Sequence, residues 1–170
     1  MYRFDPRVRD FVADARDPLH VRASFGFRLA EGANFRFHSS LGGGALFDVG
    51  CYCLSLSRWI LGEPIDVAAH VRMKDGVDMT TTALLKFERG RTASVWASME
   101  SPEEQEVTVI SGAAVHTIER PFTGPVKPNE PYRLMVESFA ESVLNNRPAK
   151  IPPSESIANM RVIDRIRAAL

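Results

Sequence analysis

Strict alternation of apolar and polar side chains indicates that much of this chain is β-structure. Residues 19–30 alternate in this way over their whole length, which is typical of a strand with one buried face. The same pattern returns after residue 64 and predicts five further strands: Ile65–Met73, Met79–Glu88, Thr92–Glu100, Glu106–Ser111 and Val115–Glu119. The separators are short turn signals such as Arg89-Gly90-Arg91 and Ser101-Pro102, so we expect neighbouring strands of this run to pair antiparallel.

Apolar residues at helical spacing predict four helices. These are Pro6–Ala15, Ala45–Leu61, Tyr132–Leu144 and a last helix from Ser154 to the end of the chain. Asp5 is the expected N-cap of the first helix, Gly62 ends the second, and Ser154 is the expected cap of the last. Two segments rich in glycine, asparagine, serine or proline, Glu31–Gly44 and Pro121–Pro131, are expected to be loops.

The order of these elements predicts the fold class. Strands that follow one another in a run, with the helices before and after them, indicate an α+β domain with a large, mainly antiparallel sheet and helices packed on one face. The opposite face would present small hydroxyl side chains together with Trp96. Such a mixed surface favours a contact between subunits, and we therefore expect a homo-oligomer, a dimer or larger, through the open sheet face. The alternative is a solvated face with one isolated tryptophan.

Composition excludes several classes of function. The 170 residues suit a single domain, 45% of them are hydrophobic, and the 21 basic residues are balanced by 21 acidic ones. Neither nucleic acid nor a membrane surface is therefore an expected partner. No signal peptide or spanning segment is apparent, so we expect a cytoplasmic location. Cys51 and Cys53 are expected to be free thiols, because two positions of a helix this close cannot form a disulfide and two cysteines cannot form a zinc site.

The segment Gly42–Tyr52 is the part of the sequence most suggestive of chemistry. Three glycines, Gly42 to Gly44, lead directly into a predicted helix and let the backbone approach a ligand or another segment closely. This is not a dinucleotide-binding fingerprint, because no Gly-x-Gly-x-x-Gly follows a strand here. It is not a P-loop either, because no Gly-Lys-Ser/Thr closes it.

Asp48 and Tyr52 lie four residues apart at the start of this helix, so their side chains share one face. A carboxylate can accept hydrogen bonds from substrate hydroxyls, and a phenol can donate or accept the proton of an oxygen that changes oxidation state. A free tyrosine titrates near 10, so it acts as a base at neutral pH only beside a cation. The alternative is a capping aspartate and a core tyrosine with purely structural roles.

The string GGGALFDVGCYCLSLSRWILGEP, residues 42–64, resembles the catalytic-helix motif of the Gfo/Idh/MocA family, in particular its glucose–fructose oxidoreductase, xylose dehydrogenase and dihydrodiol dehydrogenase branch. The opening MYRFDPRVRDFV and the tail from Tyr132 onward are also similar to that family. The resemblance implies an N-terminal Rossmann domain followed by an α+β domain with a large, mainly antiparallel sheet. It therefore implies an NAD(P)-dependent oxidoreductase that acts on a sugar, polyol or diol.

By this resemblance, Tyr52 occupies the position of the catalytic tyrosine and Asp48 that of the aspartate that helps to bind substrate. The resemblance also implies that Gly43, Gly44, Arg3 and Arg36 lie near substrate or cofactor, in the cleft between the two domains. For the two arginines the alternative is a surface position without a role in the site. No metal is implied.

The chain departs from the family pattern because it contains neither a strand–Gly-x-Gly-x-x-Gly–helix unit nor the Glu-Lys-Pro motif, whose lysine would support Tyr52. We therefore expect residues 1–170 to form the substrate-side and oligomerisation domain alone, without its Rossmann domain. NAD or NADP would bind the full-length parent, whereas this chain by itself would bind no cofactor and would be inactive. The alternatives are a scaffold or interaction domain and a sugar-binding domain, both without redox catalysis.

Overall fold

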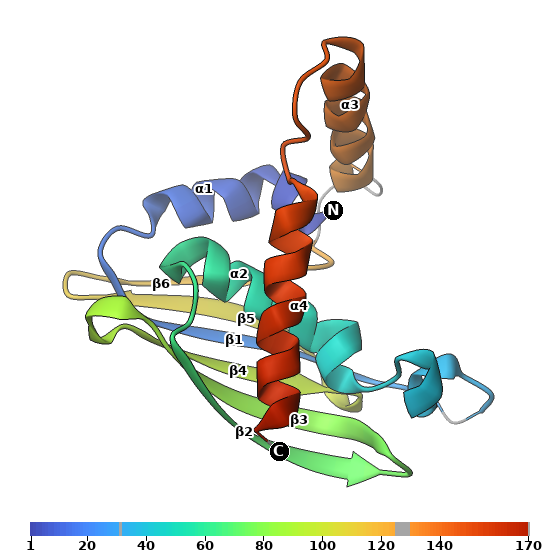
Figure 1. Ribbon diagram of the computed structural model, residues 1–170. Helices are drawn as coiled ribbons and strands as arrows, with labels where there is room; N and C mark the ends of the chain where they lie inside the picture. Colours follow the sequence, from blue (N-terminus) through green and yellow to red (C-terminus); the bar gives the residue numbers. More distant parts are fainter. Residues whose placement is uncertain (31, 125–129, 170) are drawn as a thin grey trace.

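A six-stranded sheet with helices on one face forms the body of the protein. The computed structural model describes residues 1–30, 32–124 and 130–169. The helices are α1 (Pro6–Asp14), α2 (Cys51–Leu61), α3 (Glu130–Leu144) and α4 (Pro153–Ala168); the strands are β1 (Pro18–Arg28), β2 (Asp66–Lys74), β3 (Val77–Lys86), β4 (Thr92–Ser98), β5 (Glu100–Ser111) and β6 (Val115–Glu119). Helices α1, α2 and α4 lie over the same face of the sheet, and α3 projects away from it (Figure 1). The predicted α+β class is confirmed.

The strand order is β2-β3-β4-β1-β5-β6, which differs from the sequence prediction at one point. The expected antiparallel pairing of β4 with β5 is wrong, because β1 lies between them, parallel to β4 and antiparallel to β5. Strand β1 can take this central position because its inward side chains Val21, Ala23 and Phe25 are all buried, and two neighbours satisfy its backbone on both edges. The other consecutive pairs of the run, β2–β3, β3–β4 and β5–β6, are antiparallel as predicted.

Strand β5 begins earlier than predicted, because Ser101-Pro102 is not a turn. The chain reverses at a bend at Met99, and β5 starts at Glu100. The pairing of β1 with β5 shifts register between Gly26, opposite Glu104, and Arg28, opposite Glu100, so residues 101–103 form a bulge. Proline is tolerated in such a bulge because its missing N–H is not needed for the strand ladder.

The two faces of the sheet differ as the alternating pattern predicts. On the helix side, Ala83, Leu85, Val95 and Ala97 are at most 1% exposed and belong to the hydrophobic core. On the other face, Thr82 and Leu84 are exposed and Trp96 is half-buried. This mixed face is not covered by any described helix (Figure 1).

The helix ends follow local backbone chemistry. Asp5 caps α1 as predicted, since its Oδ1 accepts a hydrogen bond from the Arg7 backbone N–H at 2.9 Å. Gly62 ends α2 with a φ of 89°, a conformation that favours glycine. The predicted cap at Ser154 is wrong: Pro152 is the N-cap and Pro153 the first helical residue, a position where the fixed φ of proline suits the helix.

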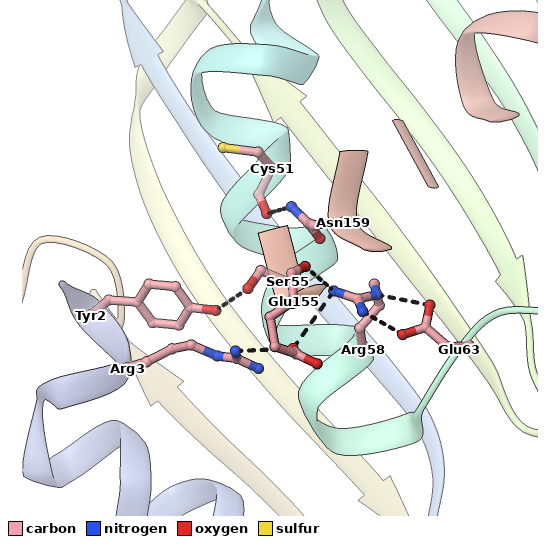
Figure 2. Close-up of polar contacts among 8 residues, drawn as sticks. All are labelled: Tyr2, Arg3, Cys51, Ser55, Arg58, Glu63, Glu155 and Asn159. Atoms are coloured by element: carbon pink, nitrogen blue, oxygen red, sulfur yellow. Dashed lines mark hydrogen bonds and ion pairs between the residues drawn. The ribbon is translucent and has the colours of Figure 1, made fainter. Parts of the chain in front are cut away.

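Helix α4 is held against α2 by polar contacts (Figure 2). The Asn159 side-chain amide donates to the Cys51 carbonyl at 3.0 Å, and the buried Arg58 guanidinium pairs with Glu63 and donates to the Glu155 carbonyl at 3.4 Å.

Cys51 and Cys53 are free thiols, as predicted. Residues 121–124 of the expected loop Pro121–Pro131 form a turn and its centre lies outside the described residues. None of the described helices has the length and apolar character needed to cross a bilayer.

Candidate functional site

Asp48 lies in a π-helical turn, Leu46–Gly50, which precedes α2 within the predicted helix. Such turns occur frequently at functional sites. Strand β3 holds this turn through Asp78, whose Oδ2 accepts hydrogen bonds from the Leu46 backbone N–H and from the Thr81 hydroxyl, both at 2.7 Å. The carboxylate therefore satisfies one of the backbone donors that the start of a helix leaves without a partner.

Gly43 and Gly44 let the chain pack closely at this point. Gly44 has a φ of 116°, which residues with a side chain rarely adopt, and a Cβ there would overlap Oδ1 of Asp78. A Cβ at Gly43 would overlap the carbonyl group of Arg36. Neither glycine lines the cavity that contains Tyr52. Both contribute to placing the turn that carries Asp48, and their predicted proximity to substrate or cofactor stays a prediction.

A cavity of about 330 Å³ opens beside the predicted pair of functional residues. Its lining comes from the first residue of the chain, β1, the short turn Phe35–Phe37, the π-helical turn, α2, β5, the turn after β6 and the start of α3. The lining residues are Met1, Phe25, Phe27, Arg36, Asp48, Val49, Tyr52, Glu103, Gln105, Phe122, Thr123 and Tyr132. The fold thus gathers Arg36, Asp48 and Tyr52, all singled out from the sequence, at one cavity.

Arg36 and Asp48 form an ion pair at this cavity, with Nε of Arg36 2.7 Å from Oδ2 of Asp48. Arg36 comes from the short turn Phe35–Phe37, where Asn34 caps the backbone, and its guanidinium lies over the Phe35 ring at 4.8 Å. The pair fixes the orientation of the Asp48 carboxylate. That carboxylate can still accept hydrogen bonds from a ligand.

Tyr52 is held by aromatic contacts. Its ring lies 5.8 Å from that of Tyr2, 5.9 Å from Phe25 and 5.7 Å from Phe122, in tilted or edge-on arrangements. Burial raises the pKa of Tyr52, and nearby Cys51, Tyr132 and Asp48 raise it further. Its hydroxyl has no hydrogen-bond partner within the part of the chain that the structure describes, so it is free to contact a ligand.

One wall of the cavity carries polar residues that the sequence did not single out. Buried Gln105 donates from Nε2 to the Thr123 hydroxyl at 2.6 Å and to Oε1 of Glu103 at 3.2 Å, and its Oε1 accepts from the Thr123 backbone N–H at 3.2 Å. Arg120 donates to the same Glu103 oxygen at 2.7 Å. These residues were missed because Ser101-Pro102 was expected to be a turn, so residues 101–105 were not assigned to a strand. Residues 103–106 are all polar, so no alternation in the sequence marks Glu103 and Gln105.

Arg3 lies elsewhere. Its Nη1 is 3.1 Å from Oε2 of Glu155 (Figure 2). Its guanidinium covers the Trp59 ring at 4.7 Å. It lines a separate cavity of about 540 Å³ between α1, the end of α2 and the start of α4. A role of Arg3 toward substrate or cofactor stays a prediction.

Nothing among the described residues suits a metal ion or a dinucleotide. They include no group of three or more histidine, cysteine, aspartate or glutamate side chains placed to bind a metal. A pyrophosphate is usually held where a strand leads through a glycine-rich turn into a helix. Here β1 is followed by short turns with Phe35–Phe37 and Ser39–Leu41, and the glycines that follow are used for packing.

Comparison with known proteins decides the family. Residues 14–114 match the family model described as the GFO/IDH/MocA C-terminal domain. The chain belongs to the GFO/IDH/MocA family. One relative within that family, a D-xylose 1-dehydrogenase (NADP(+)) of Haloferax volcanii, is 33% identical over 98% of this chain. Another, a dTDP-3,4-didehydro-2,6-dideoxy-alpha-D-glucose 3-reductase of Streptomyces antibioticus, is 28% identical over 75% of this chain.

Solved GFO/IDH/MocA-like structures share the fold. An aldose-aldose oxidoreductase from Caulobacter crescentus has a TM-score of 0.88 at 21% identity, and a 3-ketoreductase from Actinomadura kijaniata has 0.89 at 19%. Both similarities cover 99% of this chain, but only 59% and 60% of those proteins. The match to the Haloferax enzyme likewise covers 59% of that enzyme, and that to the Streptomyces reductase 38%. The chain thus spans little more than half of these proteins at most.

Proposed function

We propose that this chain is the substrate-side domain of an NAD(P)-dependent oxidoreductase that acts on a CH–OH group of a sugar, polyol or diol. The observation that carries the proposal is the meeting of Arg36, Asp48 and Tyr52 at a cavity of about 330 Å³. The family supports it, since the relatives of this chain include a D-xylose dehydrogenase and a reductase of a dTDP-linked deoxysugar.

The nicotinamide cofactor would be bound mainly outside this chain. The described residues offer no turn for its pyrophosphate, and the relatives extend well beyond the matched region. The dinucleotide therefore belongs, in this proposal, to a Rossmann domain that the 170 residues do not include. On this proposal the isolated chain would neither bind NAD or NADP tightly nor turn over substrate.

Tyr52 would transfer the proton that accompanies the redox step. Because burial raises its pKa, the phenol is protonated at neutral pH and suited to donate a proton to a carbonyl oxygen that is being reduced. In the direction of alcohol oxidation it would have to accept a proton, and this requires a cation that lowers its pKa. Arg36 acts in that direction but is the weakest of the contributions. A lysine from outside this chain, as the family resemblance implies, would complete the pair.

Asp48 would orient the substrate. Its carboxylate is an acceptor of hydrogen bonds and lies at the same cavity as Tyr52, so it can hold a hydroxyl next to the reacting one. The ion pair with Arg36 keeps this carboxylate in place. Correct placement of substrate beside the proton donor is a large part of what such a site contributes to rate.

The open face of the sheet would form a homodimer or a larger oligomer. Leu84 is 59% exposed on this face beside half-buried Trp96, which suits a partly apolar contact between two copies of the chain. Light scattering at tens of micromolar should give at least twice the monomer mass, and Trp96→Glu should reduce it. A monomer under these conditions would contradict the oligomer.

The catalytic assignment is tested in the full-length enzyme with Tyr52→Phe, which keeps the ring and removes the hydroxyl. Turnover should fall by about 10²- to 10⁴-fold, the range for loss of a general acid or base. Tyr2→Phe is the matched control, because it removes a hydroxyl that binds Ser55 outside the cavity, at 2.8 Å. Undiminished turnover of Tyr52→Phe would refute the role of Tyr52.

A further inference from the structure

The charged side chains of the cavity disfavour an anionic ligand. Among the described residues of this chain, those that line it are Arg36, Asp48 and Glu103, one cation against two carboxylates. Arg36 is already paired with Asp48 at 2.7 Å, and Arg120, which is not part of the lining, is already paired with Glu103 at 2.7 Å.

Glu103 presents a free acceptor to the cavity. Both hydrogen bonds that Glu103 accepts, from Arg120 and from Gln105, go to Oε1, so Oε2 has no protein partner among the described residues. The bulge at residues 101–103 displaces this side chain from the regular ladder, and such bulges often redirect a side chain beside an active site. An ionised carboxylate can only accept, so its ligand must bring a donor such as a hydroxyl.

Thr123 supplies the complementary donor. Its Oγ1 accepts from Gln105 Nε2 at 2.6 Å, which leaves the hydroxyl proton free to point toward a ligand oxygen. Gln105 is 7% exposed and uses both ends of its amide within the protein, so this wall is ordered before a ligand arrives. A carboxylate and a hydroxyl side by side match a sugar hydroxyl, which both donates and accepts.

We propose that Glu103 is a specificity residue that selects a free, uncharged sugar or polyol over a nucleotide-linked or phosphorylated one; this inference rests on the function proposed above. A phosphoryl group needs unpaired cations or N–H donors, and here it would meet carboxylates instead. The cavity of about 330 Å³ also lies near the lower end, ~300 Å³, of the range for small-molecule sites.

The test is steady-state kinetics of the full-length enzyme with D-xylose, D-glucose and UDP-glucose, each with NAD⁺ and NADP⁺. The wild type should use a free sugar with a kcat/KM at least about 100-fold above that for UDP-glucose, as expected when a site built for hydroxyls rejects a mismatched ligand. Glu103→Gln should raise KM for the free sugar about 10-fold, the effect of weakening a hydrogen bond to a charged group, and leave kcat nearly unchanged. Glu88→Gln, an exposed carboxylate in the β3–β4 turn that does not line the cavity, is the control and should leave both constants unchanged.

Each outcome bears on one of the two proposals. A preference for UDP-glucose, with turnover that still depends on Tyr52, would overturn the selectivity and leave the proposed function standing. An unchanged KM in folded Glu103→Gln would overturn the role of Glu103. Absence of turnover of any sugar with either nicotinamide would overturn the proposed function and, with it, this inference. The comparison of substrates needs no variant, so it decides the selectivity even if Glu103→Gln does not fold.

Discussion

The carboxylate of Asp78 links strand β3 to the π-helical turn that carries Asp48, and replacing it by alanine tests that link. The substitution removes the acceptor of two hydrogen bonds of 2.7 Å, from the Leu46 backbone N–H and from the Thr81 hydroxyl. Leu46 and Thr81 are 2% and 0% exposed, so neither donor can readily turn to water. We expect the start of the helix to loosen and the fold to lose stability.

The size of the effect follows from these contacts. A hydrogen bond to a charged group contributes about 1.5–3 kcal/mol, and a lost helix cap typically costs ~1 kcal/mol. Asp78 itself is only half-buried, so water replaces part of what is lost. We therefore expect Asp78→Ala to lower the free energy of unfolding by about 2–4 kcal/mol. Asp78→Asn is the matched control: it retains an oxygen acceptor and should cost only about 1 kcal/mol.

Gly44→Ala extends this test, because its Cβ would overlap Oδ1 of Asp78. In the wild type it should cost about 1–3 kcal/mol from backbone strain alone, with the overlap in addition. In the Asp78→Ala background the overlap is gone and only the strain at φ 116° remains, so the two effects should be non-additive by about 0.5–3 kcal/mol.

The assay is urea unfolding of the chain, followed by far-ultraviolet circular dichroism and fitted to two states. An Asp78→Ala variant within about 0.5 kcal/mol of the wild type would refute the anchoring role, since that is the range of surface substitutions without a specific contact. Additive effects of the two substitutions would refute the proposed overlap between Gly44 and Asp78.

Three further predictions follow from the core and the helix contacts. Phe122→Ala should lower the free energy of unfolding by about 3–5 kcal/mol in the same assay, because its 2%-exposed ring stacks on Phe25 at 5.3 Å; a loss below about 1 kcal/mol would contradict this packing. Burial raises the pKa of Cys51 to about 11 and raises that of Cys53, so iodoacetamide at pH 8 should label the native chain far more slowly than the urea-unfolded chain, and equal rates would argue against buried thiols. The raised pKa of Cys51 should leave the free energy of unfolding unaffected below the unfolded thiol pKa of about 8.5. As the pH rises from there toward 11, the free energy of unfolding should fall, and this fall should be smaller in Cys51→Ala.

Local sequence pattern accounts for the elements and their faces. The bounds predicted for the last strand, Val115–Glu119, are those of β6, because this short segment is rich in β-branched residues and follows a turn signal at Gly112. The buried face of β3 was likewise predicted, because a period of two leaves only one way to place its apolar side chains. The cap at Asp5 followed from the proline after it.

Pairing and sites depend on residues far apart in the chain, and there local pattern was insufficient. Nothing in the alternation of residues 19–30 says that this strand separates β4 from β5, because the pairing partner of a strand is a tertiary property. From the residues alone Asp48 and Tyr52 could equally have been structural, and it was the family resemblance that favoured a site. Arg36 joins them only through a turn whose conformation no periodicity predicts.

The central place of β1 affects how the polypeptide can be assembled during synthesis. Strand β1 leaves the ribosome before its partners, which are residues 92–98 and 100–111. Until these are made, the apolar side chains of Val21 and Phe25 have no sheet to join and stay open to chaperones and to aggregation. The hairpin of β2 and β3 can form first from nearby residues, so the insertion of β1 is expected to be the slow step of folding, and mutations that weaken β1 should lower the yield of folded protein even where little stability is lost.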